Sequence, residues 1–131
     1  MRDEPRWLLT AVVVAAHEAL IAEHGGAGGI RDRGLLESTL ARPKNLFAYS
    51  EKASLFDLAA SYAYGLARNH CFVDGNKRIA LAAALTFLDL HGVRVEGSRE
   101  DKVLTFLRLA AGEITEADLS QWLESHSRDV R

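Results

Sequence analysis

The sequence has a single cysteine among its 131 residues, Cys71, so no internal disulfide bond can form and a reducing, cytoplasmic location is expected. It also lacks an excess of basic charge. Lysine and arginine number 16 against 18 aspartates and glutamates, a formal net charge of −2 at pH 7, so nucleic acid is not an expected partner. The apolar run at residues 8–16 is too short to span a bilayer and continues as a helical pattern, so we expect a core-facing helix and no membrane partner.

The five histidines do not have the spacing of a zinc site. A catalytic zinc ion needs three protein ligands and a second shell around them. His17, His24, His91 and His126 cannot be assembled with His70 into such a set. We therefore expect these four to be structural or surface residues.

The chain is long enough for one globular domain with a real core, and 48% of its residues are apolar. We expect a single domain over residues 1–131, with a short frayed tail at about 127–131. Capping residues and helical spacing predict an all-α bundle of about six helices. The second helix is expected to stop before Pro43, and residues 93–95 to form an extended piece without a convincing partner strand. The expected helices cover residues 5–23, 33–41, 54–69, 79–90, 98–111 and 115–125.

Residues 79–90 are apolar on nearly every side of a helix, which is typical of a helix in the middle of a core. We therefore expect a compact bundle around this buried central helix. Its apolar faces would consist of Ile79, Ala83, Phe87 and Leu90 on one side and Leu81, Leu85 and Leu88 on another.

Polar side chains gather immediately before that helix, in the stretch His-Cys-Phe-Val-Asp-Gly-Asn-Lys-Arg at positions 70–78. Asp74 or Asn76 can cap the helix, whose first backbone N–H groups have no intrahelical partner. These N–H groups and the positive end of the helix dipole form an anion site, to which Lys77 and Arg78 add formal charge.

The same stretch offers a metal ligand and a base beside that anion site. Gly75 allows a phosphate to come close to the backbone, and Asp74 suits a phosphate that arrives with Mg²⁺. His70 lies four residues before Asp74, so it can face the same pocket as a general base. A base, a metal carboxylate and an anion site around one phosphate describe group transfer from a nucleotide to a hydroxyl.

Plainer interpretations exist for the same residues. Asp74 could serve only as a helix cap, and Lys77 and Arg78 could form a solvated first turn, although cations at a helix N-terminus oppose the dipole and so favour a bound anion. Phe72 is expected to anchor the loop in the core rather than to touch substrate. Cys71 is expected to be a spacer rather than a nucleophile, because no second histidine lies nearby in sequence.

The pattern His-x-Phe-x-Asp-Gly-Asn-Lys-Arg resembles the signature of the Fic/Doc family. Its Asn-Lys-Arg ending is similar to the Doc (death-on-curing) branch, the toxins of type II toxin–antitoxin systems. The resemblance continues at residues 29–38, 41–43 and 46–49, and it covers most of residues 7–125. It implies the compact helical fold of that family. Cys71 stands where the family usually has proline, and Ile79 where Doc chains often have threonine.

Two positions bear on which group is transferred. Fic proteins that transfer AMP carry glycine where this chain has Lys77 and a second arginine where it has Leu81. Both differences follow the Doc pattern, in which the nucleotide is turned around. The resemblance therefore implies transfer of the γ-phosphate of ATP, with Mg²⁺, rather than of AMP.

The resemblance also implies roles and partners. The target would be a threonine of elongation factor Tu, whose phosphorylation arrests translation, and a small antitoxin would neutralise the toxin through a disordered tail that folds on its surface. The implied site residues are His70 as the base on the acceptor hydroxyl, Asp74 as the magnesium ligand, Gly75 and Asn76 in the anion hole, and Lys77 and Arg78 on the phosphates.

Three functions remain open from the sequence. The first is ATP-dependent phosphotransfer by a toxin. The second is transfer of AMP or a related group to a protein hydroxyl, which Lys77 and Leu81 disfavour. The third is a non-catalytic module that binds a nucleotide or a partner, which the intact His70, Asp74 and Asn76 disfavour.

Overall fold

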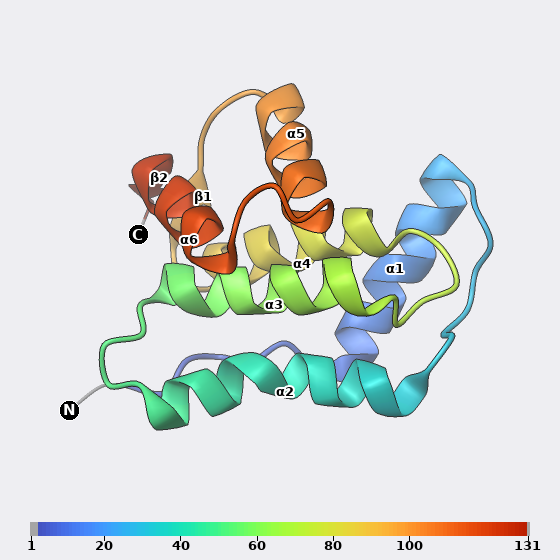
Figure 1. Ribbon diagram of the computed structural model, residues 1–131, viewed down its shortest axis with the longest axis horizontal. Helices are drawn as coiled ribbons and strands as arrows, with labels where there is room; N and C mark the ends of the chain where they lie inside the picture. The colour runs from blue at the N-terminus through green and yellow to red at the C-terminus, as the bar shows by residue number, and fades with distance from the viewer. Residues whose placement is uncertain (1–2, 131) are drawn as a thin grey trace.

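The computed structural model describes residues 3–130. Over this range the chain folds into six α-helices and two short β-strands (Figure 1), which confirms the predicted all-α bundle. Its elements are α1 (Thr10–His24), α2 (Arg33–Tyr49), α3 (Leu55–Asn69), α4 (Asn76–Leu90), β1 (Val93–Val95), α5 (Arg99–Ala110), α6 (Glu116–Ser125) and β2 (Ser127–Asp129).

Two adjacent helices, α3 and α4, share the central position. Helix α3 contacts α2, α4, α5 and α6, while α4 contacts α1, α3, α5 and β1. Figure 1 shows α2 running along one side of α3 and α5 and α6 on the other. The interior faces of both central helices combine small residues with large ones, which lets the backbones approach while the large side chains fill the core. The fully buried large side chains of α3 and α4 include Leu58, Tyr62, Leu66, Ile79 and Phe87.

Helix α1 begins at Thr10 rather than near residue 5, because the preceding segment is held by tertiary contacts. The backbone N–H of Leu8 donates to the hydroxyl of Tyr62 at 3.0 Å, and that of Arg6 donates to Nε2 of His91 at 3.0 Å. The ring of Trp7 packs against two core phenylalanines. An extended chain satisfies these contacts where a helix would not.

Helix α2 does not stop before Pro43 but continues through it to Tyr49. A proline inside a helix removes one backbone hydrogen bond and costs about 3 kcal/mol. Here Pro43 is itself buried, and the turn beyond it places Leu46 and Phe47 against the core. Tertiary packing therefore outweighs the local penalty.

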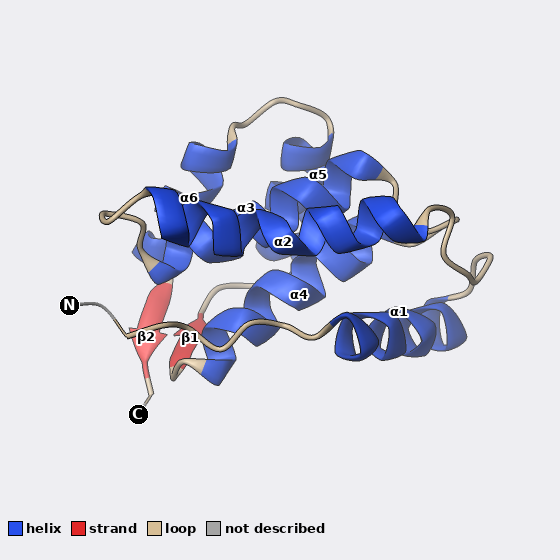
Figure 2. Ribbon diagram, turned by 90° about the horizontal axis from the view of Figure 1, so that it is seen from below, coloured by secondary structure: helices blue, strands red, loops and turns tan. Residues whose placement is uncertain are grey.

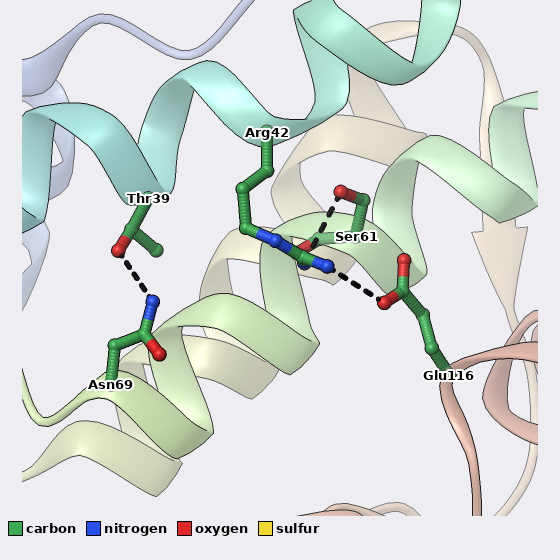
Figure 3. Close-up of polar contacts among 5 residues, drawn as sticks. All are labelled: Thr39, Arg42, Ser61, Asn69 and Glu116. Atoms are coloured by element: carbon green, nitrogen blue, oxygen red, sulfur yellow. Dashed lines mark hydrogen bonds and ion pairs between the residues drawn. The ribbon is translucent and has the colours of Figure 1, made fainter.

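Two polar contacts fix α2 against α3 (Figure 3). The guanidinium of Arg42 donates to the backbone carbonyl of Ser61 at 2.8 Å and to the Ser61 hydroxyl at 3.4 Å. It also donates to Glu116 Oε1, at the start of α6, at 3.0 Å. Further along, Asn69 Nδ2 donates to Thr39 Oγ1 at 2.9 Å. The second contact fixes the C-terminal end of α3.

The chain beyond α6 corrects two predictions. Residues 127–129, expected to belong to a frayed tail, form β2 and pair antiparallel with β1 (Figure 2), although no pair of strands was expected. The register places Val93 opposite Asp129 and Val95 opposite Ser127. Pairing of segments more than thirty residues apart leaves no local sequence signal. Residue 131 of the predicted tail lies outside the described residues.

The capping residues at the start of α3, α5 and α6 agree with the prediction from the sequence. Ser54 with Asp57 and Thr115 with Asp118 form reciprocal capping boxes, and the side chain of Ser98 accepts a hydrogen bond from the backbone N–H of Asp101. Among the helices described, none combines the length and the apolarity that crossing a bilayer requires.

Candidate active site

An open cavity of about 690 Å³ lies where the end of α1, the loop between α3 and α4, and one face of α5 meet. Its size falls within the usual range of small-molecule sites, about 300–1,000 Å³. The lining residues are His24, Gly25 and Gly26 from α1 and the loop after it, His70, Val73, Asp74, Gly75, Asn76, Lys77, Arg78 and Leu81 from the loop and α4, and Val103, Phe106 and Leu107 from α5.

His70 caps the C-terminal end of α3 in a left-handed conformation, with φ 51° and ψ 52°. No other non-glycine residue in the described range has a positive φ. The guanidinium of Arg31 donates to the backbone carbonyls of Asn69 and His70, so it satisfies acceptors that the end of the helix leaves free. The backbone of His70 is thus held while its side chain stays exposed at the cavity.

The next three residues, 71–73, run antiparallel to the segment before α2. The carbonyl of Cys71 accepts from the N–H groups of Arg31 and Asp32 at 2.8 and 3.1 Å, and the N–H of Val73 donates to the carbonyl of Gly29 at 3.1 Å. Ile30 and Phe72 form a bridge between the two segments. The loop therefore has a fixed backbone although it carries no regular secondary structure.

Cys71 is fully buried, and its thiol donates to Thr39 Oγ1 at 3.4 Å. Burial raises the pKa of the Cys71 thiol above its ordinary value, and the hydrogen bond to Thr39 offsets only part of this. A buried, protonated thiol is a poor nucleophile. Cys71 does not line the cavity, so its position agrees with the spacer interpretation.

The prediction that Asp74 or Asn76 caps α4 is wrong, because the N-cap is Gly75 in a left-handed conformation and no side chain caps the helix. The amide of Asn76 instead turns back to Phe72. Its Oδ1 accepts from the Phe72 N–H at 3.1 Å and its Nδ2 donates to the Phe72 carbonyl at 3.0 Å. This double hydrogen bond closes the loop on itself and holds the buried Phe72 ring at the base of the site.

The carboxylate of Asp74 is oriented by two backbone N–H groups. Oδ1 accepts from Gly75 at 2.8 Å, and Oδ2 accepts from Ala27 at 3.4 Å. Glycine at position 26 leaves room for this orientation, because a Cβ atom there would lie 2.7 Å from Asp74 Oδ2 and would force the carboxylate to shift. No group of three or more histidine, cysteine or acidic residues able to hold a metal occurs within residues 3–130. A lone carboxylate fits Mg²⁺, which takes most of its ligands from phosphate and water.

The first turn of α4 supplies the anion-binding groups. The first intrahelical hydrogen bond runs from the N–H of Ile79 to the carbonyl of Gly75, so the N–H groups of Asn76, Lys77 and Arg78 have no partner within the helix. The side chains of Lys77 and Arg78 are exposed at the cavity. Together these groups provide positive charge where the dipole of α4 is also positive.

Aliphatic side chains also line the cavity. They are Leu81 of α4 and Val103 and Leu107 of α5, and the two α5 side chains remain 38% and 43% exposed. A pocket lined by both cations and aliphatic side chains suits a ligand that has a charged part and an apolar part, as a nucleotide does.

Comparison with known proteins agrees with this geometry. Residues 7–88 match the model of a family described as the Fic/DOC family. The chain is 40% identical over 111 residues to "Protein kinase doc" of Escherichia phage P1, which covers 85% of this chain and 87% of that protein. The chain belongs to the Fic/DOC family.

A second relative supports the same assignment. "Toxin Doc" of Mycolicibacterium smegmatis (strain ATCC 700084 / mc(2)155) is 47% identical over 72 residues, 54% of this chain and 55% of that protein. The matched family region contains the whole loop between α3 and α4, so the cavity is built around the part of the chain that carries the Fic/DOC resemblance.

In this Fic/DOC chain six of the seven predicted site residues line one cavity. The seventh, Phe72, lies beneath the loop and is 1% exposed. The side chain of Asn76 is engaged with the Phe72 backbone, so only its N–H is available to an anion. The six lining residues are His70, Asp74, Gly75, Asn76, Lys77 and Arg78.

Sequence reasoning missed three contributors to the site. Arg31 fixes the end of α3, His24 lines the cavity, and His17 lies buried under the loop. For His17 a signal existed, because it follows Val13 by four residues on the buried face of α1. The role of Arg31 depends on a contact across 38 residues and had no comparable signal.

Proposed function

We propose that this protein is the toxin of a toxin–antitoxin pair and transfers the γ-phosphate of ATP to a hydroxyl of a protein. The observation that carries the proposal is that His70, Asp74 and the first turn of α4 line one cavity. Phosphoryl transfer asks the protein mainly to position the reactants and to stabilise charge. A base, a carboxylate and an anion site in one cavity meet those two requirements.

Each side chain has one task in this proposal. His70 accepts the proton of the acceptor hydroxyl, because its exposed imidazole borders the cavity. Asp74 holds Mg²⁺, which neutralises charge on the phosphates when it is bound. The N–H groups of Gly75 and Asn76 line the anion hole, and the Gly75 N–H also donates to Asp74 Oδ1. Lys77 and Arg78 contact the outer phosphates.

Lys77 and Leu81 bear on which phosphate of ATP lies near His70. Lys77 occupies the first turn of α4, where AMP-transferring relatives have glycine, and narrows the space beside the anion site. Leu81 contributes an aliphatic side chain to the cavity where those relatives have a phosphate-binding arginine. Both residues favour placing the terminal phosphate, rather than the α-phosphate, near His70.

The proposed target is a threonine of elongation factor Tu, so translation would stop in the cytoplasm. The resemblance to the Doc branch implies this target, and the names of two relatives support the broader activity of a toxin and a kinase. The relatives are named "Protein kinase doc" and "Toxin Doc", and the first matches 85% of this chain. The proposed partner is an antitoxin with a disordered tail that folds on the toxin, for which the exposed aliphatic side chains of α5 offer contact area.

The deciding experiment supplies purified protein, Mg²⁺ and elongation factor Tu with ATP labelled at either the α- or the γ-phosphate. Label from γ-ATP alone is expected, and His70→Ala should lower the rate by about 10²–10⁴-fold. His126→Ala is the matched control, because His126 lies at the end of α6 beside Trp122 and does not line the cavity.

The other outcomes separate the alternatives. Label from α-ATP would identify an AMP transferase and contradict the argument from Lys77 and Leu81. Label from neither, with a melting temperature that Mg-ATP raises equally in wild type and His70→Ala, would identify a binding module without turnover.

A further inference from the structure

His17 lies in the middle of α1 and contacts the loop between α3 and α4 in two ways. Its side chain is 1% exposed, and its ring stacks on the ring of Phe72 with 3.8 Å between centroids and 14° between planes. Its Nε2 atom lies 2.7 Å from the backbone carbonyl oxygen of Asp74. A carbonyl oxygen can only accept, so Nε2 carries the proton and donates it to this bond.

The hydrogen bond acts on the peptide unit that joins Asp74 to Gly75. In a trans peptide the carbonyl and the N–H point in opposite directions. Because His17 holds the carbonyl on the side of α1, the N–H of Gly75 must point the other way, and there it donates to Asp74 Oδ1 at 2.8 Å. The orientation of the Asp74 carboxylate therefore depends on a donor 57 residues away in sequence.

Gly75 packs closely against the side chains of α1. Gly75 adopts φ +75°, and a Cβ atom on it would lie 3.3 Å from His17 Nε2 and 3.2 Å from Ile21 Cδ1. The start of α4 thus rests directly on α1. A substitution at His17 would therefore shift Gly75, the N-cap of α4, and the backbone N–H groups that follow it.

We propose that His17 is a positioning residue of this active site. Through its Nε2–H it fixes the Asp74–Gly75 peptide, so that the Asp74 carboxylate and the first turn of α4 are oriented before Mg-ATP binds. His17 does not line the cavity and so does not touch the ligand itself. This inference rests on the proposed function for the identity of the ligand, and on geometry alone for the positioning.

The test compares three variants by calorimetric binding of Mg-ATP, thermal unfolding and amide exchange of Gly75. His17→Phe keeps a ring to stack on Phe72 but has no donor, and His17→Gln restores an N–H at a similar reach. His91→Phe is the matched control, because His91 Nδ1 also donates to a backbone carbonyl, that of Phe87, at 2.7 Å but lies outside the cavity.

We expect His17→Phe to raise the Kd for Mg-ATP by about 10- to 100-fold, the usual effect of removing a partner that orients a metal ligand. Amide exchange of Gly75 should accelerate in the same variant. His17→Gln should recover most of both properties. His91→Phe should lower the melting temperature and leave both unchanged.

A wild-type Kd in His17→Phe, whatever its melting temperature, would overturn the proposal and leave His17 a packing residue. If wild-type protein itself did not bind Mg-ATP, the proposed function would fail. Exchange of the Gly75 amide without nucleotide would then decide the positioning role, because equal rates in wild type and His17→Phe would refute it. If His17→Phe did not fold, His17→Gln and a His17→Asn variant, whose shorter amide cannot reach the Asp74 carbonyl, would make the same comparison.

Discussion

Gly65 lies on the side of α3 that faces α2, and its missing side chain leaves room for two residues of that helix. A Cβ atom at position 65 would lie 2.7 Å from Thr39 Cγ2 and 3.1 Å from Arg42 Cδ. Real Cβ atoms are essentially never found as close as the first distance, so Gly65→Ala requires one of the helices or side chains to shift. Alanine is nevertheless the better helix former. Whether Gly65→Ala stabilises or destabilises the protein therefore depends on whether the gain in helix propensity exceeds the cost of the close contact.

The magnitudes favour destabilisation. Alanine in place of glycine inside a helix contributes about 1 kcal/mol. Forcing an extra methyl group into a packed interior costs about 1–3 kcal/mol. Thr39 cannot rotate away without cost, because it is 1% exposed and its Oγ1 accepts from Asn69 and Cys71. Losing one such hydrogen bond costs about 1 kcal/mol more. We expect the free energy of unfolding to fall by about 1–3 kcal/mol.

Thermal unfolding of the purified variants measures this. For a chain of this length the expected loss lowers the melting temperature by roughly 3–12 °C. Gly34→Ala is the matched control, because it also places alanine in a helix, but its Cβ atom would meet only Asp32 Oδ1 at an ordinary 3.7 Å. That variant should gain up to about 1 kcal/mol. If Gly65→Ala were as stable as Gly34→Ala, the argument from close packing between α2 and α3 would be refuted.

Three further predictions concern the site and α6. Gly26→Ala should raise the Kd for Mg-ATP about tenfold, because its Cβ atom would displace the Asp74 carboxylate. The control is Gly28→Ala, whose Cβ atom meets open space, and its Kd should stay within about twofold of the wild-type value. Equal Kd values for the two variants by calorimetry would contradict this prediction. Cys71 should react with thiol reagents only as fast as the protein unfolds, because burial raises its pKa and excludes the reagent, and rapid labelling of native protein would contradict its burial. Hydrogen bonds from Thr115, the N-cap residue of α6, lower the pKa of Asp118. The ionised carboxylate therefore stabilises the folded protein fully at pH values above the ordinary carboxyl pKa, and this stabilisation is lost as the pH falls through the lowered pKa. The melting temperature of Asp118→Asn should therefore lie below that of wild type near neutral pH and meet it in acid, whereas a constant difference would refute the assignment.

The candidate site was largely readable from the sequence because its residues are close together in the chain. A base, a carboxylate and two cations within residues 70–78 must lie near one another wherever the fold places them. The helices were readable for the same reason, since the capping boxes that begin at Ser54 and Thr115 act within four residues. Their physical cause is local, so the signal is local.

The tertiary structure decided everything that depends on contact between distant segments. Helix α2 continues through Pro43 because packing on α3 outweighs a local cost, and β2 forms because β1 lies beside it. Neither the cap at Gly75 nor the turn of Asn76 toward Phe72 follows from residue type alone, since both amides and carboxylates can cap a helix.

The orientation of the site depends on distant contacts as well. His17 and Arg31 fix the loop from positions 57 and 39 residues away, through hydrogen bonds to backbone carbonyls that carry no sequence signature. The sequence by itself thus determined which chemical groups the site contains and where the six helices lie, apart from the start of α1 and the part of α2 beyond Pro43. Only the tertiary structure decided where those groups point, because the partners that hold them become neighbours only when the chain folds.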